Sequence, residues 1–115
     1  MSNAAADVVQ RQVDAYNARD LDRFVAQFSD AVQVFRPPSP QPAISGKAQL
    51  AEYYAANRFN LPALRADILG RMVVGSRVID HERIHGVRDE PFEVAAVYDV
   101  VDGLIRTVWF FAAEG

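Results

Sequence analysis

Both histidines of the chain, His81 and His85, lie in the short segment Val78-Ile-Asp-His-Glu-Arg-Ile-His85. If this segment is a strand, the alternation of its side chains places both histidines on one face with Arg83, opposite Asp80 and Glu82. If the histidine face lines a pocket, His81 could act as a general base beside the positive charge of Arg83, or Arg83 could bind a substrate carboxylate. If it faces solvent, these side chains are solvated or paired with carboxylates of neighbouring strands. The two histidines are roughly 13 Å apart on such a strand, so we expect no shared metal site.

Other residues could complete a binding pocket. Arg36, just before a proline-rich stretch, could guard the pocket mouth and select anionic ligands, although an arginine in such a position is more often simply solvated. Tyr16 and Tyr54 could supply hydroxyl groups as polar anchors, although core packing also accounts for tyrosines of this spacing. The chain contains no cofactor motif, so we expect no cofactor, and any catalysis would use general acid and base groups.

Length and charge exclude several classes of protein. The 115 residues suffice for one domain, and we expect a flexible N-terminus over residues 1–6 and a single domain over residues 7–115. A net charge of -3, with scattered basic residues, does not favour binding to nucleic acid. The absence of cysteine excludes disulfides and thiol chemistry. No apolar run approaches the length of a membrane span, and we expect a cytoplasmic protein with no membrane contact.

The elements that must position these residues are helical in the first half of the chain. Asp20 is placed to cap the second of two short helices. The expected helices carry Val9, Val13 and Tyr16, then Leu21, Phe24, Val25 and Phe28, and finally extend from Lys47 to about Arg58. Between the second and third helices a strand is expected over Val32–Phe35, after which Pro37, Pro38, Pro40 and Pro42 exclude regular ladder bonding.

The second half of the chain is rich in β-branched and aromatic residues. Strands are expected near residues 64–74, 77–87, 92–101 and 104–113, and Asp102-Gly103 is the strongest hairpin signal between them. Helices followed by an antiparallel meander predict an α+β fold, in which a bent sheet closes around the three N-terminal helices.

Several segments in this order resemble the nuclear transport factor 2-like superfamily, and within it the SnoaL-like and ketosteroid isomerase-like branch. The segments are Tyr16–Phe24, Phe28–Asp30, Ser45–Lys47 and Val97–Trp109. The resemblance implies a cystatin-like α+β barrel, a cone formed by a curved, mostly antiparallel sheet around the helices. It also implies an apolar pocket inside the cone and frequent dimerisation through the outer sheet face. Function varies widely on this fold, so the chemistry must be sought in the residues.

The catalytic carboxylates of two branches are missing at the matching positions. Ketosteroid isomerases use an aspartate base near the end of the first strand, where this chain has Phe35 and Arg36. Limonene epoxide hydrolases use two aspartates and an arginine. Arg83 matches that arginine, but His85 and Phe110 stand where the aspartates would be.

The comparison with the epoxide hydrolases also implies which face of the strand points inward. It places His81, Arg83 and His85 on the inner face, together with Tyr98, Val108 and Phe110. His85 would lie at the rim, because it is next to the turn at Gly86.

We therefore expect a pocket for a small apolar or weakly anionic molecule, with His81 and Arg83 as candidate catalytic residues. The expected ligand contacts are Tyr16, Phe28, Arg36, Tyr54, His85, Tyr98, Val108 and Phe110. If the protein is catalytic, a cofactor-independent isomerase or hydrolase fits best. The alternative is a noncatalytic domain with a residual cavity, which forms a homodimer through the outer sheet face at Trp109 and Phe111. Packing of these two aromatics within the monomer remains a further alternative.

Overall fold

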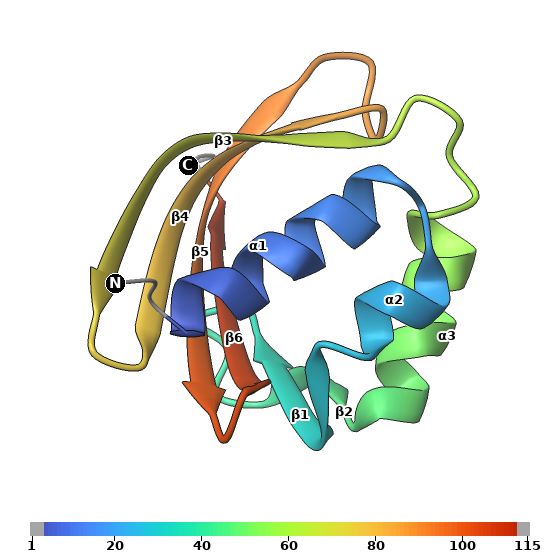
Figure 1. Cartoon of the computed structure of the whole chain (residues 1–115). Coiled ribbons are helices and arrows are strands. Elements are labelled where there is room, and N and C mark those ends of the chain that lie inside the picture. Colours follow the sequence, from blue (N-terminus) through green and yellow to red (C-terminus); the bar gives the residue numbers. More distant parts are fainter. Residues whose placement is uncertain (1–3, 113–115) are drawn as a thin grey trace.

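The structure, a computed structural model, describes residues 4–112 as a curved, open sheet with helices on its concave side (Figure 1). The helices are α1 (Ala4–Asn17), α2 (Leu21–Val25) and α3 (Lys47–Asn57). The strands are β1 (Phe28–Phe35), β2 (Pro42–Ser45), β3 (Arg65–Val74), β4 (Arg77–His85), β5 (Phe92–Val101) and β6 (Leu104–Ala112). Their order in the sheet is β2-β1-β6-β5-β4-β3. All neighbours are antiparallel except β1 and β6, so the predicted α+β fold with a mostly antiparallel, curved sheet is confirmed.

The ends of the chain are only partly described. Of the segment expected to be flexible, residues 1–3 lie outside the described residues, whereas residues 4–6 belong to α1. Residue 113, the last of the strand expected over 104–113, also lies outside them. Within the described part, no helix is long and apolar enough to cross a membrane.

The sequence prediction is wrong at two places before α3. Helix α2 ends at Val25, and Phe28 begins β1 instead of extending the helix; its ring packs 4.9 Å from that of Phe24. The proline-rich stretch also contains a strand, β2, whose first residue Pro42 lies opposite Phe35 of β1. Because β2 is at the edge of the sheet, Pro42 can join it without a hydrogen-bonding N–H on the open side.

A bulge in β3 reverses the faces of that strand. Ile68 lies opposite Glu82 of β4, but Gly70 lies opposite the adjacent His81, so Leu69 is an extra residue without a partner. Ala66 faces the core before the bulge. After it the odd-numbered side chains point inward, and this brings Arg71 to the concave face, opposite the fully buried Asp80.

The convex face of the sheet carries an apolar row that crosses five strands. Each of its residues lies directly opposite the next on the neighbouring strand: Met72, Ile79, Val97, Trp109 and Phe35. The rings of Trp109 and Phe35 stack with their centroids 6.4 Å apart. On the concave face, α1 packs against the sheet and aromatic residues fill the space between the helices, with Tyr54 and Phe24 4.7 Å apart between centroids. The two faces therefore differ, because among the described residues helices cover only the concave face (Figure 1).

Candidate functional site

A pocket opens on the concave side of the sheet, between α1, the end of α3 and strands β3 to β6. Its cavity volume is about 70 Å³, and the cavity opens to solvent. Its apolar wall is formed by Val13, Ala66, Ile84, Phe92, Val94 and Phe110. Its polar groups are Gln12, Glu82, the tyrosines Tyr16, Tyr54 and Tyr98, and the arginines Arg36 and Arg58.

Glu82 is the carboxyl group of this pocket. It lies on the inner face of β4 and is 5% exposed, and the Tyr98 hydroxyl donates a hydrogen bond of 3.0 Å to its Oε2. Burial, together with the nearby negative charge of Asp80, raises the pKa of Glu82 to about 7. A carboxyl group with this pKa takes up and releases a proton near neutral pH, as a general acid or base must.

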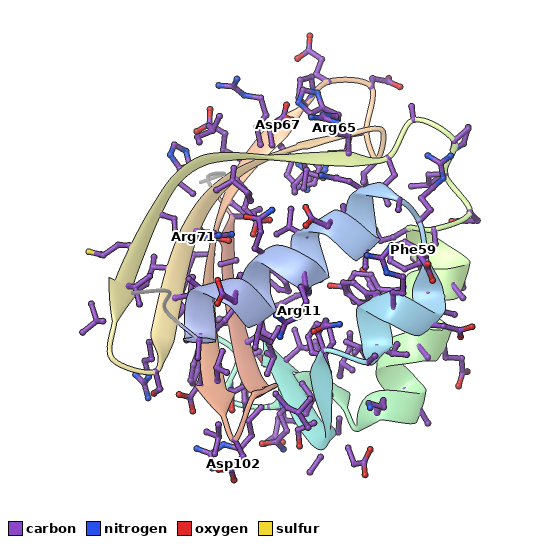
Figure 2. All side chains as sticks on the ribbon, in the orientation of Figure 1. Arg11, Phe59, Arg65, Asp67, Arg71 and Asp102 are labelled. Carbon is purple, nitrogen blue, oxygen red and sulfur yellow. The ribbon has the colours of Figure 1, made fainter. Side chains whose placement is uncertain are left out.

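Asp80, the next residue on the same face of β4, has a different role. It is fully buried and accepts two hydrogen bonds from Arg71, Nε to Oδ1 at 2.7 Å and Nη2 to Oδ2 at 2.9 Å. Arg71 also donates through Nη1 to Oε1 of Gln10 at 2.9 Å, which joins β3 and β4 to α1. Figure 2 shows Arg71 between the sheet and this helix. Asp80 is therefore held in a bidentate ion pair, and Glu82 is the carboxyl that lines the pocket.

The tyrosines of the pocket remain protonated at neutral pH. Burial raises the pKa of Tyr54 to about 12, although the charges of Arg36 and Arg58 oppose the shift. Burial likewise raises the pKa of Tyr16. Both phenols can therefore donate a hydrogen bond to a ligand oxygen.

Gln12 contributes a hydrogen-bond acceptor to the pocket, whereas the tyrosines contribute donors. It is 6% exposed, and its Oε1 is buried without a hydrogen-bond partner among the described residues. A buried acceptor of this kind requires a donor from a ligand or a water molecule. Within residues 4–112 there is no cluster of three or more His, Asp or Glu side chains that could hold a metal ion.

Five of the ligand contacts expected from the sequence lie at the pocket: Tyr16, Arg36, Tyr54, Tyr98 and Phe110. Their contact with a ligand stays a prediction. The side chains of Phe28 and Val108, also expected there, are buried in the hydrophobic core and do not line the pocket.

The inward orientation expected for His81, Arg83 and His85 is wrong. All three side chains lie on the convex face, where His81 and Arg83 both contact the Glu93 carboxylate, the latter at 3.4 Å. The His85 Nε2 lies 2.9 Å from the Asp67 Oδ2. This pair is at the end of the sheet opposite to the hairpin turn at residues 102–103 (Figure 2). The side chain of His81 is 55% exposed. These residues therefore form ion pairs outside the pocket, as the alternative interpretation of this face expected.

The alternation of β4 was predicted correctly, and only the assignment of its faces was wrong. Val78 and Ile84 share the inner face with Asp80 and Glu82, whereas the outer face has Ile79 as its one apolar residue within β4. The two flanking apolar side chains were the signal for the inner face. The pairing of β4 with β5 identifies the same inner face, because the side chains of Asp80 and Glu82 lie opposite residues that line the pocket or belong to the core.

The sequence and the fold both have known relatives. The model of the SnoaL-like domain family matches residues 9–108. An uncharacterised cystatin-fold protein from Novosphingobium aromaticivorans superposes with a TM-score of 0.83 at 25% identity, over 95% of this chain and 98% of that one. A protein proposed to be a ketosteroid isomerase, from Kribbella flavida, has a TM-score of 0.83 at 19% identity, over 97% of this chain and 79% of that one. An epoxide hydrolase from M. tuberculosis that is similar to limonene epoxide hydrolase has a TM-score of 0.76 at 19% identity, over 95% and 82% of the two chains.

Proposed function

This chain belongs to the SnoaL-like domain family, and from that premise we propose that its pocket binds a small, mostly apolar carbonyl compound and moves a proton on it. Glu82 is the acid and base group of this proposal. The observation that carries it is the position of the Glu82 carboxyl, which is buried in the pocket wall, hydrogen-bonded by Tyr98 and has its pKa raised to about 7. Glu82 takes the catalytic role that the sequence suggested for His81 and Arg83, which lie on the convex face.

The proposed reaction is an isomerisation by proton transfer. The ionised Glu82 removes a proton from the carbon next to the carbonyl group. The electron pair of that C–H bond forms a C=C bond, and the π pair of the carbonyl group moves to its oxygen, so that an enolate forms. The neutral hydroxyl of Tyr16 or Tyr54 donates a hydrogen bond to this oxygen, where negative charge develops. The protonated Glu82 then returns the proton to a different carbon as the carbonyl reforms, so the step needs no cofactor.

A hydrolase is the second candidate for the same pocket. In this reaction Glu82 would remove a proton from a water molecule instead of from carbon. The observation in its favour is the unpartnered Oε1 of Gln12, because a water molecule could donate to that acceptor. Incorporation of ¹⁸O from labelled water into the product would distinguish hydrolysis from isomerisation.

The test of the proposed function is proton exchange catalysed by wild type and Glu82→Gln. Cyclohex-3-enone in D₂O is a suitable probe, because proton NMR follows both its isomerisation and its uptake of deuterium beside the carbonyl. We expect the variant to lose roughly 10²- to 10⁴-fold in rate, the usual contribution of a general base. The wild-type rate should rise with pH through a midpoint near 7, as Glu82 ionises.

The matched control is Glu93→Gln, which makes the same change on the convex face of the neighbouring strand. This variant should retain the wild-type rate and pH profile. Equal rates for wild type and Glu82→Gln would contradict the proposed function.

A role in dimerisation is the alternative function, and it concerns the opposite face of the sheet. The apolar row from Met72 to Phe35 supports it, because no helix of this chain covers that face in the described residues. The two roles use different faces and do not compete.

A further inference from the structure

The mouth of the pocket carries two arginines that come from distant parts of the chain. Arg36 follows the end of β1, and Arg58 follows the end of α3, yet both line the same pocket. Arg36 is exposed and Arg58 is half-buried, whereas Glu82 and Gln12 are both buried. The pocket is therefore cationic at its mouth and acidic at its floor.

Neither arginine takes part in an ion pair with a carboxylate among the described residues. Each is held instead over an aromatic ring, with the Arg36 guanidinium 5.3 Å from the centroid of Phe110 and that of Arg58 5.6 Å from the centroid of Tyr53. Arg58 also donates through Nη1 to the carbonyl oxygen of Asn57 at 2.9 Å. Stacking of this kind positions a guanidinium while leaving N–H donors free to bind an anion.

The two positive charges act on a common part of the pocket. Both arginines lower the pKa of Tyr54, in opposition to the larger effect of its burial. Their fields therefore converge near this hydroxyl, where the opposing effect of Glu82 is smaller than that of either arginine. An anionic group is stabilised at this position, whereas near Glu82 it would meet a second carboxylate above pH 7.

We propose that the ligand is an amphipathic carboxylate, whose carboxylate group binds between Arg36 and Arg58 at the mouth and whose apolar body extends toward Glu82. This inference rests on the proposed function, since it names the class of substrate on which that pocket acts. The binding mode orients the ligand, because its charged end stays at the mouth and its carbonyl-bearing end reaches the acid at the floor. The body packs on the apolar wall, where Val94 and Ile84 lie beside Glu82.

The test compares two probes of nearly equal shape, 3-oxocyclohexanecarboxylate and the neutral 3-oxocyclohexanecarboxamide. Their dissociation constants are measured by calorimetry at pH 6, where the carboxylate probe is ionised. We expect the wild-type protein to bind the carboxylate at least tenfold more tightly. Arg36→Gln and Arg58→Gln should each weaken carboxylate binding by about tenfold, as expected for the loss of a charge-assisted hydrogen bond. The affinity for the amide should stay unchanged, which would also show that the pocket is intact.

The matched control is Arg11→Gln, which removes the same charge from the exposed face of α1, where Arg11 Nε donates to Gln27. It should leave both affinities unchanged. Three results would each overturn the inference. They are equal affinities of the wild type for the two probes, no detectable binding of the carboxylate, and an equal loss of affinity for both probes in the arginine variants. Glu82→Gln should retain the preference for the carboxylate, so a failure of proton transfer and a failure of anion selection give different results.

Discussion

At the scale of single residues, the distinctive feature of this protein is a carboxyl group that is buried although burial disfavours its ionised form. Glu82 is placed where solvent is excluded and where Asp80 adds a second negative charge, so its ionised form is disfavoured in the folded protein. Tyr98 and Arg71 oppose this effect but do not abolish it. A group held in this way reduces stability when it ionises, which is a common property of functional sites.

The first prediction concerns the pH dependence of stability. Glu82 titrates near pH 7 in the folded protein and near 4.5 in the unfolded chain, so between these values the folded state binds more protons. The free energy of unfolding should therefore fall as pH rises from about 4.5 through 7. Glutamine does not titrate, so the free energy of unfolding of Glu82→Gln should increase by roughly 3 kcal/mol relative to that of wild type between pH 4.5 and 8. Urea denaturation across this range measures the difference.

Glu93→Gln is the control for this prediction, and its effect should have the opposite sign. Hydrogen bonds from His81 and Arg83 lower the pKa of Glu93, so its ionised form stabilises the folded state. That contribution is present above the unfolded pKa and is lost as pH falls through the folded pKa. A constant difference between Glu82→Gln and wild type over the whole range would contradict the assignment of Glu82 as a buried acid with a raised pKa.

At the scale of elements, the end of β4 and the loop before β3 are held in close contact by Gly86. It has a positive φ of 84°, and a Cβ atom there would lie 2.3 Å from the carbonyl carbon and oxygen of Ala63. These are backbone atoms, which cannot rotate away as a side chain can. The contact positions the start of β3, where Ala66 lines the pocket.

The second prediction follows from this contact. Gly86→Ala should destabilise the protein by roughly 3 kcal/mol or more, because it adds a steric clash to the cost of a positive φ. Gly75→Ala is a matched control, since Gly75 also has a positive φ of 58° but no atom within 4 Å of the added Cβ. It should cost only about 1 kcal/mol. Thermal and urea denaturation of the two variants measure the comparison, and equal losses would show that the contact with Ala63 contributes nothing.

Elements defined by local signals were predictable from the sequence, whereas those that depend on distant partners were not. Asp102 and Gly103 form the expected hairpin turn, both with positive φ, because turn chemistry is local. Strand β2 was missed because the restriction on Pro42 disappears at a sheet edge, and edge position depends on the whole sheet.

The same distinction explains what was missed at the site. The pocket tyrosines and Arg36 were identified by type and by resemblance, and they do line the pocket. The partner of Asp80 was not predicted, because Arg71 reaches the inner face only through the bulge at Leu69, for which Gly70 within the strand was the one local signal. The faces of β4 were assigned by comparison with relatives, when its own apolar residues were the better guide.

At the scale of the whole molecule, the convex face is an apolar surface between two charged regions. The row from Met72 to Phe35 is bordered on one side by Arg77, which contacts Asp99 and stacks 5.2 Å from the centroid of Trp109. On the other side lie Phe111 and then the ion pairs of Glu93. An apolar centre with a charged rim is the usual composition of a protein interface. A second copy of this chain would present the same row and the same rim, and a twofold dimer through this face would bring the two rows together.

The third prediction is that the protein forms a homodimer through this row and that Val97→Glu dissociates it. Val97 lies at the centre of the row, between Ile79 and Trp109, so a carboxylate there would be buried in the interface without a partner. We expect the dimer dissociation constant to rise at least roughly 100-fold, which corresponds to about 3 kcal/mol. Leu104→Glu is the matched control, because Leu104 is exposed but lies beside the hairpin turn, away from the row. Sedimentation equilibrium measures the oligomeric state of the three proteins. Loss of the dimer in Val97→Glu alone would place the interface at this row. A wild type that is monomeric at high concentration, or equal dissociation of both variants, would contradict an interface there.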